Sequence, residues 1–509
     1  MTILSHNHVV AFPVQAWGHC RPLITLAARF VTLRPVHVTF LTTNRYYDKV
    51  KAELARNFGH GEETRANKVR VISIGDWQSD ACNESFKAVW AKLCAAEEIK
   101  CAKTAITHDA LPEPQAAIVD AFAVAPVATI RKMSGNTVKI YGWYPASTLA
   151  MFYLLGPERW GGMGDVHAKA QVEAQQTGRS YEEVVFEMLY VPKGEVVEVP
   201  GLPPMYDYEY HPQDFPVPAD IGIGIFPRVY QALRSCDGMF LFTAESYEPE
   251  AVAASKSWLA ETGRSAYACG PLLPPTGSHA VLYEKKQSKQ GIEIQNFLDA
   301  TLSKSGEKSL LYISLGSHFW PVKTPEKLWA FLDVVIESNI PFIMSHAPYT
   351  DYIPSQVREK VGVYGKGLLS AWSPQQTILE HPATGWYVTH GGHNGVNEAI
   401  HAGVPMILWP FVGDQPLNAI HISETLQVGY ELLEVRTGYG LKQIYRNGRR
   451  PLGTLDAVKN EARNVLAKAF GEDGALKRER LKALTRALDH EWEAGGTSLR
   501  DVTAFLDSL

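Results

Sequence analysis

The chain is poor in cysteine, and the few cysteines that it has are not grouped. Its 509 residues include six cysteines, and no two of them form a Cys-x-x-Cys pair. A disulfide framework needs a higher density of cysteines, and a zinc knuckle or thioredoxin-type site needs such a pair. The sequence therefore predicts a protein of a reducing compartment, and we expect it in the cytoplasm.

Neither an excess of basic residues nor a long apolar run is present. Lys and Arg total 49 against 54 Asp and Glu, which gives a net charge of -5. Proteins that bind nucleic acid or an anionic membrane surface normally carry a basic excess. No stretch approaches the roughly 20 apolar residues that a membrane-spanning helix needs. We therefore expect no nucleic-acid partner and no integral membrane segment, and we expect a monomer.

Two common nucleotide-binding motifs are also missing. The chain contains no Gly-x-x-x-x-Gly-Lys-Ser/Thr sequence, so it is not a P-loop NTPase. Gly-x-Gly sequences occur, among them those at residues 222–224 and 438–440, but these lack the third glycine of a dinucleotide-binding loop. The sequence therefore argues against a dehydrogenase of the Rossmann type.

What is present is the composition of a folded α/β protein. Hydrophobic residues make up 46% of the chain, and apolar runs of strand length alternate with helix-length segments in both halves. Such alternation predicts parallel sheets covered by helices on both faces. The strands that we expect are residues 8–12, 36–41, 69–74, 116–119, 239–243, 310–315, 341–344, 386–389 and 405–408. The expected helices are residues 22–33, 45–56, 84–105, 226–234, 325–338, 395–402 and 415–425, and a helical tail from residue 455.

Two breaks in this alternation suggest how the chain is divided. Residues 191–218 are rich in Pro, Tyr and acidic side chains, which predicts an irregular loop. Residues 270–277 contain two Gly and three Pro, which is typical of a linker. We therefore expect a first domain over 1–270, a linker over 271–290 and a second domain over 291–490. A helix in 491–509 is expected to return to the first domain.

The densest chemistry lies between residues 372 and 418. His390 and Gly392 stand at the end of an expected strand, and Gly395 opens an expected helix. Backbone N–H groups at a helix start, approached closely over glycine, form an anion site. Trp372 offers a flat face on which a base can stack, and Glu398 can accept hydrogen bonds from ribose hydroxyls. The stretch therefore predicts a site for a nucleotide joined to a sugar.

This stretch resembles the signature box of the family 1 UDP-glycosyltransferases, best known from plants. The shared pattern is Trp-x-Pro-Gln, His-Pro, Val-Thr-His-x-Gly-x-Asn, Glu, Gly-Val-Pro, Trp-Pro, Asp-Gln and Asn-Ala, in this order. Gly18-His19-x-x-Pro22 resembles the catalytic His motif of the family, and Val119-Asp120-Ala121-Phe122 its Asp motif. Leu315-Gly316-Ser317 resembles its Gly-Ser turn. The resemblance covers essentially the whole chain.

The resemblance implies the GT-B fold, in which two doubly wound Rossmann-like domains face a central cleft. It implies that His19 is the general base and that Asp120 orients it. It assigns the transferred sugar to Asp414 and Gln415. The residues that it assigns to UDP are Ser317, Trp372, Ser373, Gln375, His390, Gly392, Asn394, Gly395 and Glu398.

The box departs from the plant pattern at three positions of one hexapeptide. Where plant members usually have His-Cys-Gly-Trp-Asn-Ser, this chain has His390-Gly391-Gly392-His393-Asn394-Gly395. Gly395 lacks the serine hydroxyl that would touch phosphate, so only its backbone N–H remains there. The chain looks more like fungal members that glycosylate terpenoids and phenolics. The basic run at residues 446–450 lies outside the box, and we expect it to be a solvated loop.

The expected activity is transfer of glucose or xylose from a UDP-sugar to a hydroxyl of a hydrophobic small molecule, with inversion at the anomeric carbon. The acceptor is expected to be a terpenoid, a flavonoid or another phenol, in a pocket lined by Trp77, Phe122, Trp143 and Tyr206. Two alternatives remain open. One is a GT-B-fold epimerase or phosphorylase, and the other is a non-catalytic UDP-sugar-binding protein.

We expect turnover without a divalent cation. No Asp-x-Asp triplet occurs in the chain, so the usual metal-binding element of the other large glycosyltransferase fold is missing. The helix-start anion site can stabilise the leaving diphosphate instead. An activity assay after EDTA treatment should show unchanged turnover. Loss of activity that Mg²⁺ or Mn²⁺ restores would contradict this expectation.

Overall fold

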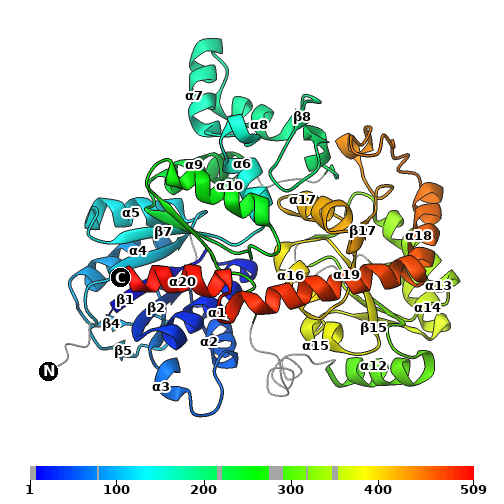
Figure 1. The fold of residues 1–509 in the computed structure, drawn as a ribbon, viewed down its shortest axis with the longest axis horizontal. Helices are drawn as coiled ribbons and strands as arrows, with labels where there is room; N and C mark the ends of the chain where they lie inside the picture. The colour runs from blue at the N-terminus through cyan, green and yellow to red at the C-terminus, as the bar shows by residue number, and fades with distance from the viewer. Residues whose placement is uncertain (1–6, 77–78, 215–219, 274–290, 317–318, 347–352) are drawn as a thin grey trace. The chain divides into compact units, whose positions relative to one another are not determined.

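The fold consists of two compact units, each built on one sheet (Figure 1). The computed structural model describes residues 7–76, 79–214, 220–273, 291–316, 319–346 and 353–509. The first unit comprises Met1–Leu189, Val217–Pro275 and His490–Leu509, and the second comprises Tyr190–Pro216 and Thr276–Asp489. Residues 274–290, most of the predicted linker, lie outside the described residues. The predicted α/β class is confirmed.

The first unit has a seven-stranded parallel sheet in the order β11-β10-β7-β6-β1-β2-β3. Its strands are β1 Asn7–Phe12, β2 Val36–Thr42, β3 Val69–Ser73, β6 Ala116–Asp120, β7 Lys139–Tyr144, β10 Gly238–Leu241 and β11 Ser265–Ala268. A separate antiparallel pair joins β4 Ile99–Lys100 to β5 Thr107–His108. The central strands are continuous buried apolar runs, as expected of parallel strands covered on both faces.

The helices of the first unit include one from the far end of the chain. They are α1 Trp17–Leu33, α2 Tyr47–Arg56, α3 Glu63–Ala66, α4 Ser79–Cys94, α5 Val124–Ser134, α6 Thr148–Leu155, α7 Val166–Thr177, α8 Tyr181–Tyr190, α9 Phe226–Arg234, α10 Pro249–Ala260 and α20 Thr497–Asp507. Phe505 of α20 is fully buried against Phe30, Tyr141 and Phe240. Asp501 accepts a hydrogen bond from the backbone N–H of Ala268 at 3.0 Å. The last helix is therefore part of the core of the first unit.

The second unit has a six-stranded parallel sheet in the order β14-β13-β12-β15-β16-β17. Its strands are β12 Leu310–Ser314, β13 Phe342–Ser345, β14 Gly367–Ser370, β15 Thr384–Thr389, β16 Met406–Leu408 and β17 Gly429–Glu431. Its helices are α12 Gly291–Ser305, α13 Pro325–Glu337, α14 Ser355–Tyr364, α15 Gln375–Glu380, α16 His393–His401, α17 Gln415–Ile420, α18 Leu455–Ala469 and α19 Glu472–Asp489.

The two faces of this second sheet differ in character. Leu311 and Ile313 of β12 and Trp386 of β15 join α13 and α18 in one hydrophobic core. Because side chains alternate along a strand, Tyr312 and Tyr387 must point to the opposite face. This second face carries the hydroxyl groups of the two tyrosines. The helices that contain residues of the signature box, α15, α16 and α17, begin beyond the edge of the sheet.

The helix predicted over 84–105 is too long. The helix α4 ends at Cys94, and the chain then forms β4 and β5. Ala96 and Ala105 have positive φ angles, which a continuous right-handed helix cannot contain. The tail from residue 455 is likewise divided into α18, α19 and α20.

Residues 190–216 pack with the second unit, although the sequence places them in the first domain. They contain the short antiparallel pair β8 Val196–Val197 and β9 Met205–Tyr206, and a 3-10 helix over Asp207–Tyr210. The Tyr208 hydroxyl donates to the carbonyl of Gln443 at 2.6 Å. The Gln213 side chain donates to the carbonyls of Pro410 and Val435 at 3.3 Å. These partners are more than 190 residues away in sequence, so no local pattern indicates them.

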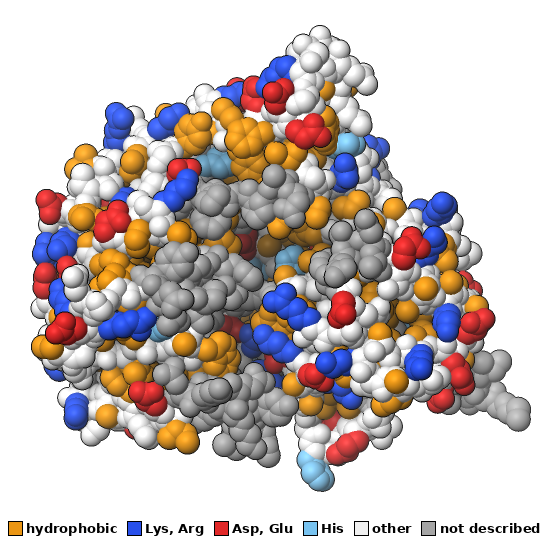
Figure 2. All heavy atoms as spheres, turned by 180° about the vertical axis from the view of Figure 1, so that it is seen from behind, with side chains coloured by type: hydrophobic (Ala, Val, Ile, Leu, Met, Phe, Trp, Pro, Cys, Tyr) orange, Lys and Arg blue, Asp and Glu red, His pale blue; other side chains and the backbone are white. Residues whose placement is uncertain are grey.

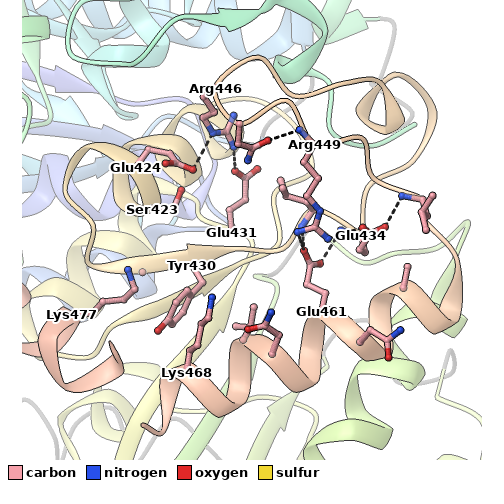
Figure 3. A pocket seen from close by; sticks show the side chains of 18 residues that line it. Ser423, Glu424, Tyr430, Glu431, Glu434, Arg446, Arg449, Glu461, Lys468 and Lys477 are labelled. Carbon is pink, nitrogen blue, oxygen red and sulfur yellow. Dashed lines mark hydrogen bonds and ion pairs between the residues drawn. The ribbon is translucent and has the colours of Figure 1, made fainter. Parts of the chain in front are cut away.

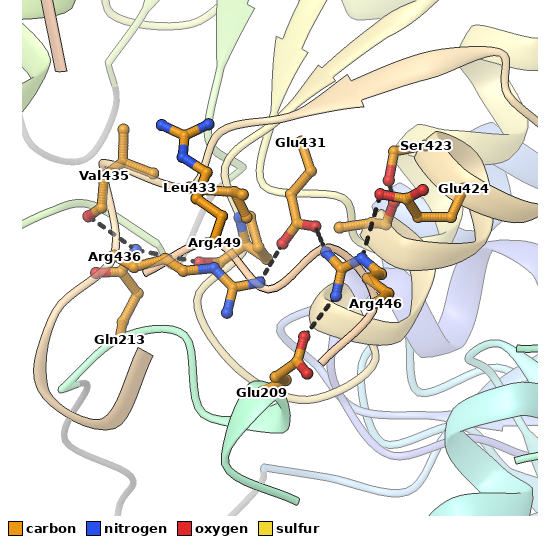
Figure 4. A network of polar contacts seen from close by, with 12 residues as sticks. Glu209, Gln213, Ser423, Glu424, Glu431, Leu433, Val435, Arg436, Arg446 and Arg449 are labelled. Atoms are coloured by element: carbon orange, nitrogen blue, oxygen red, sulfur yellow. Dashed lines mark hydrogen bonds and ion pairs between the residues drawn. The ribbon is translucent and has the colours of Figure 1, made fainter. Parts of the chain in front are cut away.

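The basic run at residues 446–450 is not simply a solvated loop. The Arg446 side chain is only 5% exposed and pairs with Glu209 at 2.5 Å and with Glu424 at 3.2 Å (Figure 4). It also pairs with Glu431, which in turn pairs with the fully buried Arg436. A buried arginine needs such partners because an isolated buried charge is very unfavourable. This buried network attaches residues 190–216 to the second unit.

The surface carries charges of both signs. On the face that Figure 2 shows, Lys and Arg side chains are interspersed with Asp and Glu. This distribution is in keeping with the near balance of 49 basic and 54 acidic residues. None of the helices among the described residues combines the length and the apolar character that crossing a bilayer requires.

The Arg446 network predicts a large effect of one substitution. Arg446→Met should lower the free energy of unfolding by about 3–5 kcal/mol, because it removes the cation that pairs with the fully buried Glu209 carboxylate. The matched control is Arg463→Met, whose ion pair with Glu337 is half exposed on both sides. That change should stay within about 1 kcal/mol. Urea unfolding followed by circular dichroism measures both, and equal effects of the two substitutions would contradict the structural role of Arg446.

Candidate active site

The first cluster of predicted site residues lies where the connections of the first sheet change direction. From β1 the chain proceeds to β2 and β3 on one side, and it returns as β6 on the other side of β1. Loops that leave the carboxyl ends of two such strands diverge and open a crevice, which is where open α/β sheets bind ligands. His19 follows β1, and Asp120 is the last residue of β6.

His19 and Asp120 form a directed hydrogen-bonded pair. The distance from His19 Nδ1 to Asp120 Oδ2 is 2.8 Å, and the two side chains are 28% and 0% exposed. The same carboxylate accepts backbone N–H groups from Val14 at 3.1 Å and from Phe122 at 3.0 Å, which fixes its orientation. In neutral imidazole, a proton on Nδ1 leaves Nε2 as the basic nitrogen. The pair therefore has the geometry of a general base and its orienting acid.

Aromatic side chains surround this pair within the first unit. The Phe122 ring meets the His19 ring edge-on, with centroids 5.8 Å apart. Tyr144 and Phe226 each lie 6.0 Å from Phe122. Phe226 opens α9 far from either motif, so it was not among the predicted site residues. The Phe122 and Phe226 rings are partly exposed and are suited to contact a flat apolar molecule next to His19, while the buried Tyr144 packs against Phe122.

The other predicted acceptor residues do not join this cluster as expected. Trp143 is fully buried, and its indole N–H donates to the backbone carbonyl of His19 at 3.2 Å. It therefore supports the His19 backbone and cannot line an open pocket. Tyr206 belongs to the second unit, where it packs on Tyr208 and Tyr445. Trp77 lies outside the described residues.

The second cluster lies at the corresponding place of the second sheet. From β12 the chain proceeds to β13 and β14, and it returns as β15 on the other side of β12. The crevice between β12 and β15 is therefore the expected ligand site of this unit. Gly316 follows β12, and His390 follows β15. Ser317, which the resemblance assigns to UDP, lies outside the described residues.

His390 fits closely between two glycines. A Cβ atom on Gly316 would lie 2.7 Å from His390 Cε1, and one on Gly392 would lie 2.5 Å from His390 Nε2. Gly316 also has a φ of +80°, which disfavours any other residue. Phe319 stacks on the imidazole with centroids 5.3 Å apart. The sequence motif shows the histidine, but Phe319 was not among the predicted site residues.

Asp414 and Gln415 hold the backbone of this site together. Asp414 Oδ2 accepts from the backbone N–H of His393 and from the amide of Asn418, both at 3.1 Å. Gln415 Oε1 accepts from the backbone N–H of Phe411 at 2.9 Å, and its side chain is almost fully buried. Asp414 therefore joins the start of α16 to that of α17, next to Asn394 and Gly395.

The residues that the resemblance assigns to base and ribose also lie in this unit. Gln375 opens α15, and its amide donates to Glu398 Oε2 in α16 at 2.5 Å. Trp372 is 44% exposed, which is unusual for tryptophan and leaves its ring available for stacking. Ser373 is buried, and its hydroxyl has no hydrogen-bond partner among the described residues.

A cavity of about 570 Å³ lies elsewhere in the second unit, between β17 and α18 (Figure 3). Arg446 and Arg449 in its wall pair with carboxylates of the same wall, including Glu434 and Glu461. Burial raises the pKa of Glu461 to about 7, although hydrogen bonds from two backbone N–H groups oppose this shift. The wall contains none of the signature residues, and its arginines are already neutralised by glutamates. We therefore assign this cavity a structural role.

Comparison with known proteins supports the signature. Residues 226–435 match the family described as UDP-glucoronosyl and UDP-glucosyl transferase. The UDP-glycosyltransferase eriJ of Hericium erinaceus is 31% identical over 519 aligned residues, covering 99% of this chain and 98% of the relative.

Solved structures share the fold at low sequence identity. A UGT transferase from Siraitia grosvenorii, solved in complex with UDP, has a TM-score of 0.66 and 17% identity, covering 98% of this chain and 99% of the other. Phytolacca americana UGT2, solved with UDP-2fluoro-glucose and pterostilbene, has a TM-score of 0.64 and 18% identity, covering 99% and 100%.

The two Rossmann-like units and these neighbours define a GT-B glycosyltransferase fold, as the resemblance implied. Because identity to eriJ exceeds 30% over nearly the whole of both chains, the chain belongs to the family 1 UDP-glycosyltransferases. The protein is therefore a glycosyltransferase.

The close fit of His390 predicts a steric effect at Gly392. Gly392 has a φ of −64°, so alanine is tolerated by the backbone, but its methyl group would displace the imidazole. Gly392→Ala should weaken UDP binding about tenfold or more, because a hydrogen bond to a charged group contributes roughly 1.5–3 kcal/mol. Titration calorimetry with UDP measures this effect.

Gly395→Ala is the matched control. A Cβ at Gly395 would meet its nearest neighbours at 3.6–3.8 Å, which is ordinary contact, and the backbone N–H is retained. This variant should bind UDP much more tightly than Gly392→Ala does. Equal affinities of the two variants would show that His390 has no part in UDP binding.

Proposed function

We propose that this chain is an inverting O-glycosyltransferase that moves glucose, or xylose, from a UDP-sugar to a hydroxyl of a hydrophobic small molecule. The observation that carries the proposal is the 2.8 Å contact between His19 Nδ1 and the fully buried Asp120 carboxylate. An epimerase, a phosphorylase or a non-catalytic UDP-sugar-binding protein would not need this oriented base. Release of UDP only when an acceptor is present distinguishes a transferase from both alternatives.

The reaction is a single displacement. His19 Nε2 takes the proton of the acceptor hydroxyl, and the oxygen attacks the anomeric carbon from the side opposite to UDP. A new carbon–oxygen bond forms as the bond to the diphosphate breaks, so the configuration inverts and UDP leaves with the electron pair. Asp120 stabilises the imidazolium that forms. This is the logic of hydrolase triads, with a substrate oxygen as the nucleophile.

The leaving diphosphate is held by His390 and by the start of α16. Helix N-termini carry a partial positive charge and bind phosphate groups. Preorganised donors at the place where negative charge develops can do the work of a cation, so we propose that no metal takes part. Three or more His, Cys, Asp or Glu side chains that could hold a metal ion do not gather anywhere among the described residues.

We assign the base to Trp372 and the ribose to Gln375 and Glu398. The exposure of the Trp372 ring and the burial of Glu398 beside Gln375 support this assignment. Asp414 and Gln415 are assigned to the sugar. Asp414 lies against the start of α16, where its Oδ2 accepts from the backbone N–H of His393, and this position beside the proposed diphosphate site supports the assignment.

The acceptor is proposed to be a flat aromatic or fused-ring molecule. The cluster of Phe122, Tyr144 and Phe226 beside His19 supports this class. The Phytolacca americana enzyme was solved with pterostilbene, which is in keeping with it. All six cysteines are free, which supports a location in the cytosol. We propose that the enzyme acts there as a monomer.

The His19–Asp120 pair predicts the behaviour of two variants. His19→Ala should lower kcat by roughly 10²–10⁴, the usual contribution of a general base, while UDP affinity stays near the parent value. Asp120→Asn should also slow turnover, because it removes the charge that stabilises the imidazolium. The double variant should be only slightly slower than His19→Ala alone, because both residues serve one proton transfer. His60→Ala, an exposed histidine of the same unit, is the control.

The measurement is steady-state kinetics with an aliphatic alcohol and an acidic phenol as acceptors. The phenol needs less help from a base, so His19→Ala should affect it less. Turnover of the aliphatic acceptor by His19→Ala at nearly the parental rate would reject the mechanism.

A further inference from the structure

Two stacked tyrosines lie beneath the proposed ribose site. Tyr312 of β12 is paired in register with Tyr387 of β15, and both side chains are about 1% exposed. Their rings are nearly parallel, with an interplanar angle of 14° and centroids 5.0 Å apart. Packing alone would be served equally well by phenylalanine. Burying a hydroxyl is unfavourable unless it is hydrogen-bonded, so the hydroxyl groups themselves need an explanation.

The Tyr387 hydroxyl is the first member of a chain of hydrogen bonds that runs through Gln375 to Glu398, and we call this chain the relay. It donates to Gln375 Oε1 at 3.0 Å and lies 3.4 Å from the carbonyl oxygen of Ser314. Burial raises the pKa of Tyr387 well above its usual value, so the hydroxyl stays protonated and can donate. Gln375 Nε2 then donates to Glu398 Oε2 at 2.5 Å.

This chain determines which way the Gln375 amide faces. An amide group presents an acceptor oxygen on one side and a donor nitrogen on the other. A hydroxyl that donates from the Tyr387 side is matched only by Oε1, so Nε2 must face Glu398. With phenylalanine at 387, only the longer 3.5 Å contact from the Tyr312 hydroxyl would remain on Oε1, so the amide nitrogen would be held less firmly toward the Glu398 carboxylate.

The first turn of α16 lies directly against the same groups. A Cβ on Gly395 would be 3.6 Å from the Tyr387 hydroxyl, 3.7 Å from Gln375 Nε2 and 3.8 Å from Thr389 Oγ1. These are ordinary contact distances, so residue 395 lies directly next to the relay. Gly395 is also one of the three positions at which the signature departs from the plant pattern, so the relay lies next to a position where this chain differs.

We propose that Tyr387 is a positioning residue for the donor: through Gln375 it holds the Glu398 carboxylate in the orientation that accepts the ribose hydroxyls. Tyr387 acts through the relay and touches no substrate. The inference rests on the proposed function, which assigns Glu398 to the ribose. It predicts that removing one buried hydroxyl selectively weakens recognition of ribose.

The test compares two ligands on one variant. Tyr387→Phe should bind UDP roughly two- to tenfold more weakly than the parent, the range expected for one net hydrogen bond. It should bind 2′,3′-dideoxy-UDP, which has no ribose hydroxyls, as the parent does. The comparison variant is Tyr312→Phe, whose hydroxyl makes the longer of the two contacts to Gln375 Oε1, 3.5 Å against 3.0 Å for Tyr387. It should lose less UDP affinity than Tyr387→Phe does.

The outcomes separate this inference from the proposed function. Absence of UDP binding by the parent itself would reject the proposed function. If the parent binds UDP and Tyr387→Phe binds it equally well, only the relay is rejected. If Tyr387→Phe binds both ligands more weakly by the same factor, the role of Tyr387 is merely structural and the relay is also rejected.

A second variant covers the case in which Tyr387→Phe does not fold, as judged by its thermal unfolding. Gln375→Met cuts the relay at its middle with a side chain of similar size. This variant should also weaken the binding of UDP more than the binding of 2′,3′-dideoxy-UDP. If the two variants fold, their combination should be no weaker than Gln375→Met alone, because both act on one carboxylate. Additive losses, or equal losses for both ligands, would overturn the inference.

Discussion

The donor half of this enzyme depends on a steric constraint at the ends of two adjacent strands. The imidazole of His390 fills a space that exists only because residues 316 and 392 have no side chain. The ring can therefore lie against the backbone that begins α16, beside the N–H groups at the helix start. Phe319 stacks on the same ring. The placement of the proposed diphosphate site follows from this fit.

The two units use the same topological feature for different chemistry. In each sheet the chain reverses the direction of its connections once, between β1 and β6 and between β12 and β15. The first of these points holds the His19–Asp120 pair, which suits proton transfer. The second holds His390 and a helix start, which suit an anion. Because strands in a parallel sheet all end at one edge, residues far apart in sequence gather there without special local structure.

Much of this could be predicted from the sequence. Strand and helix periodicities are local properties, so the alternation of elements and the α/β class follow from them. The signature residues are recognisable because they stand close together along the chain, and their positions at strand ends and helix starts bring them to one edge of the sheet. His19 and Asp120 are 101 residues apart, but each directly follows or ends an apolar run that predicts a strand.

What the sequence could not decide depends on contacts between distant segments. From the sequence, Arg446 is expected to be solvated. Its pairing with Glu209, which is 237 residues away, is part of what makes its burial possible. Trp143 reads as a pocket residue, but packing encloses it. Tyr387 reads as an ordinary strand residue, and its hydroxyl acquires a role only because Gln375 lies above it. The fold class and the family could be inferred from the sequence, and so could a set of candidate site residues, because all three depend on the local order of residues along the chain. Which charges, rings and hydroxyls meet depends on the tertiary fold, because burial and pairing require partners that no local pattern reveals.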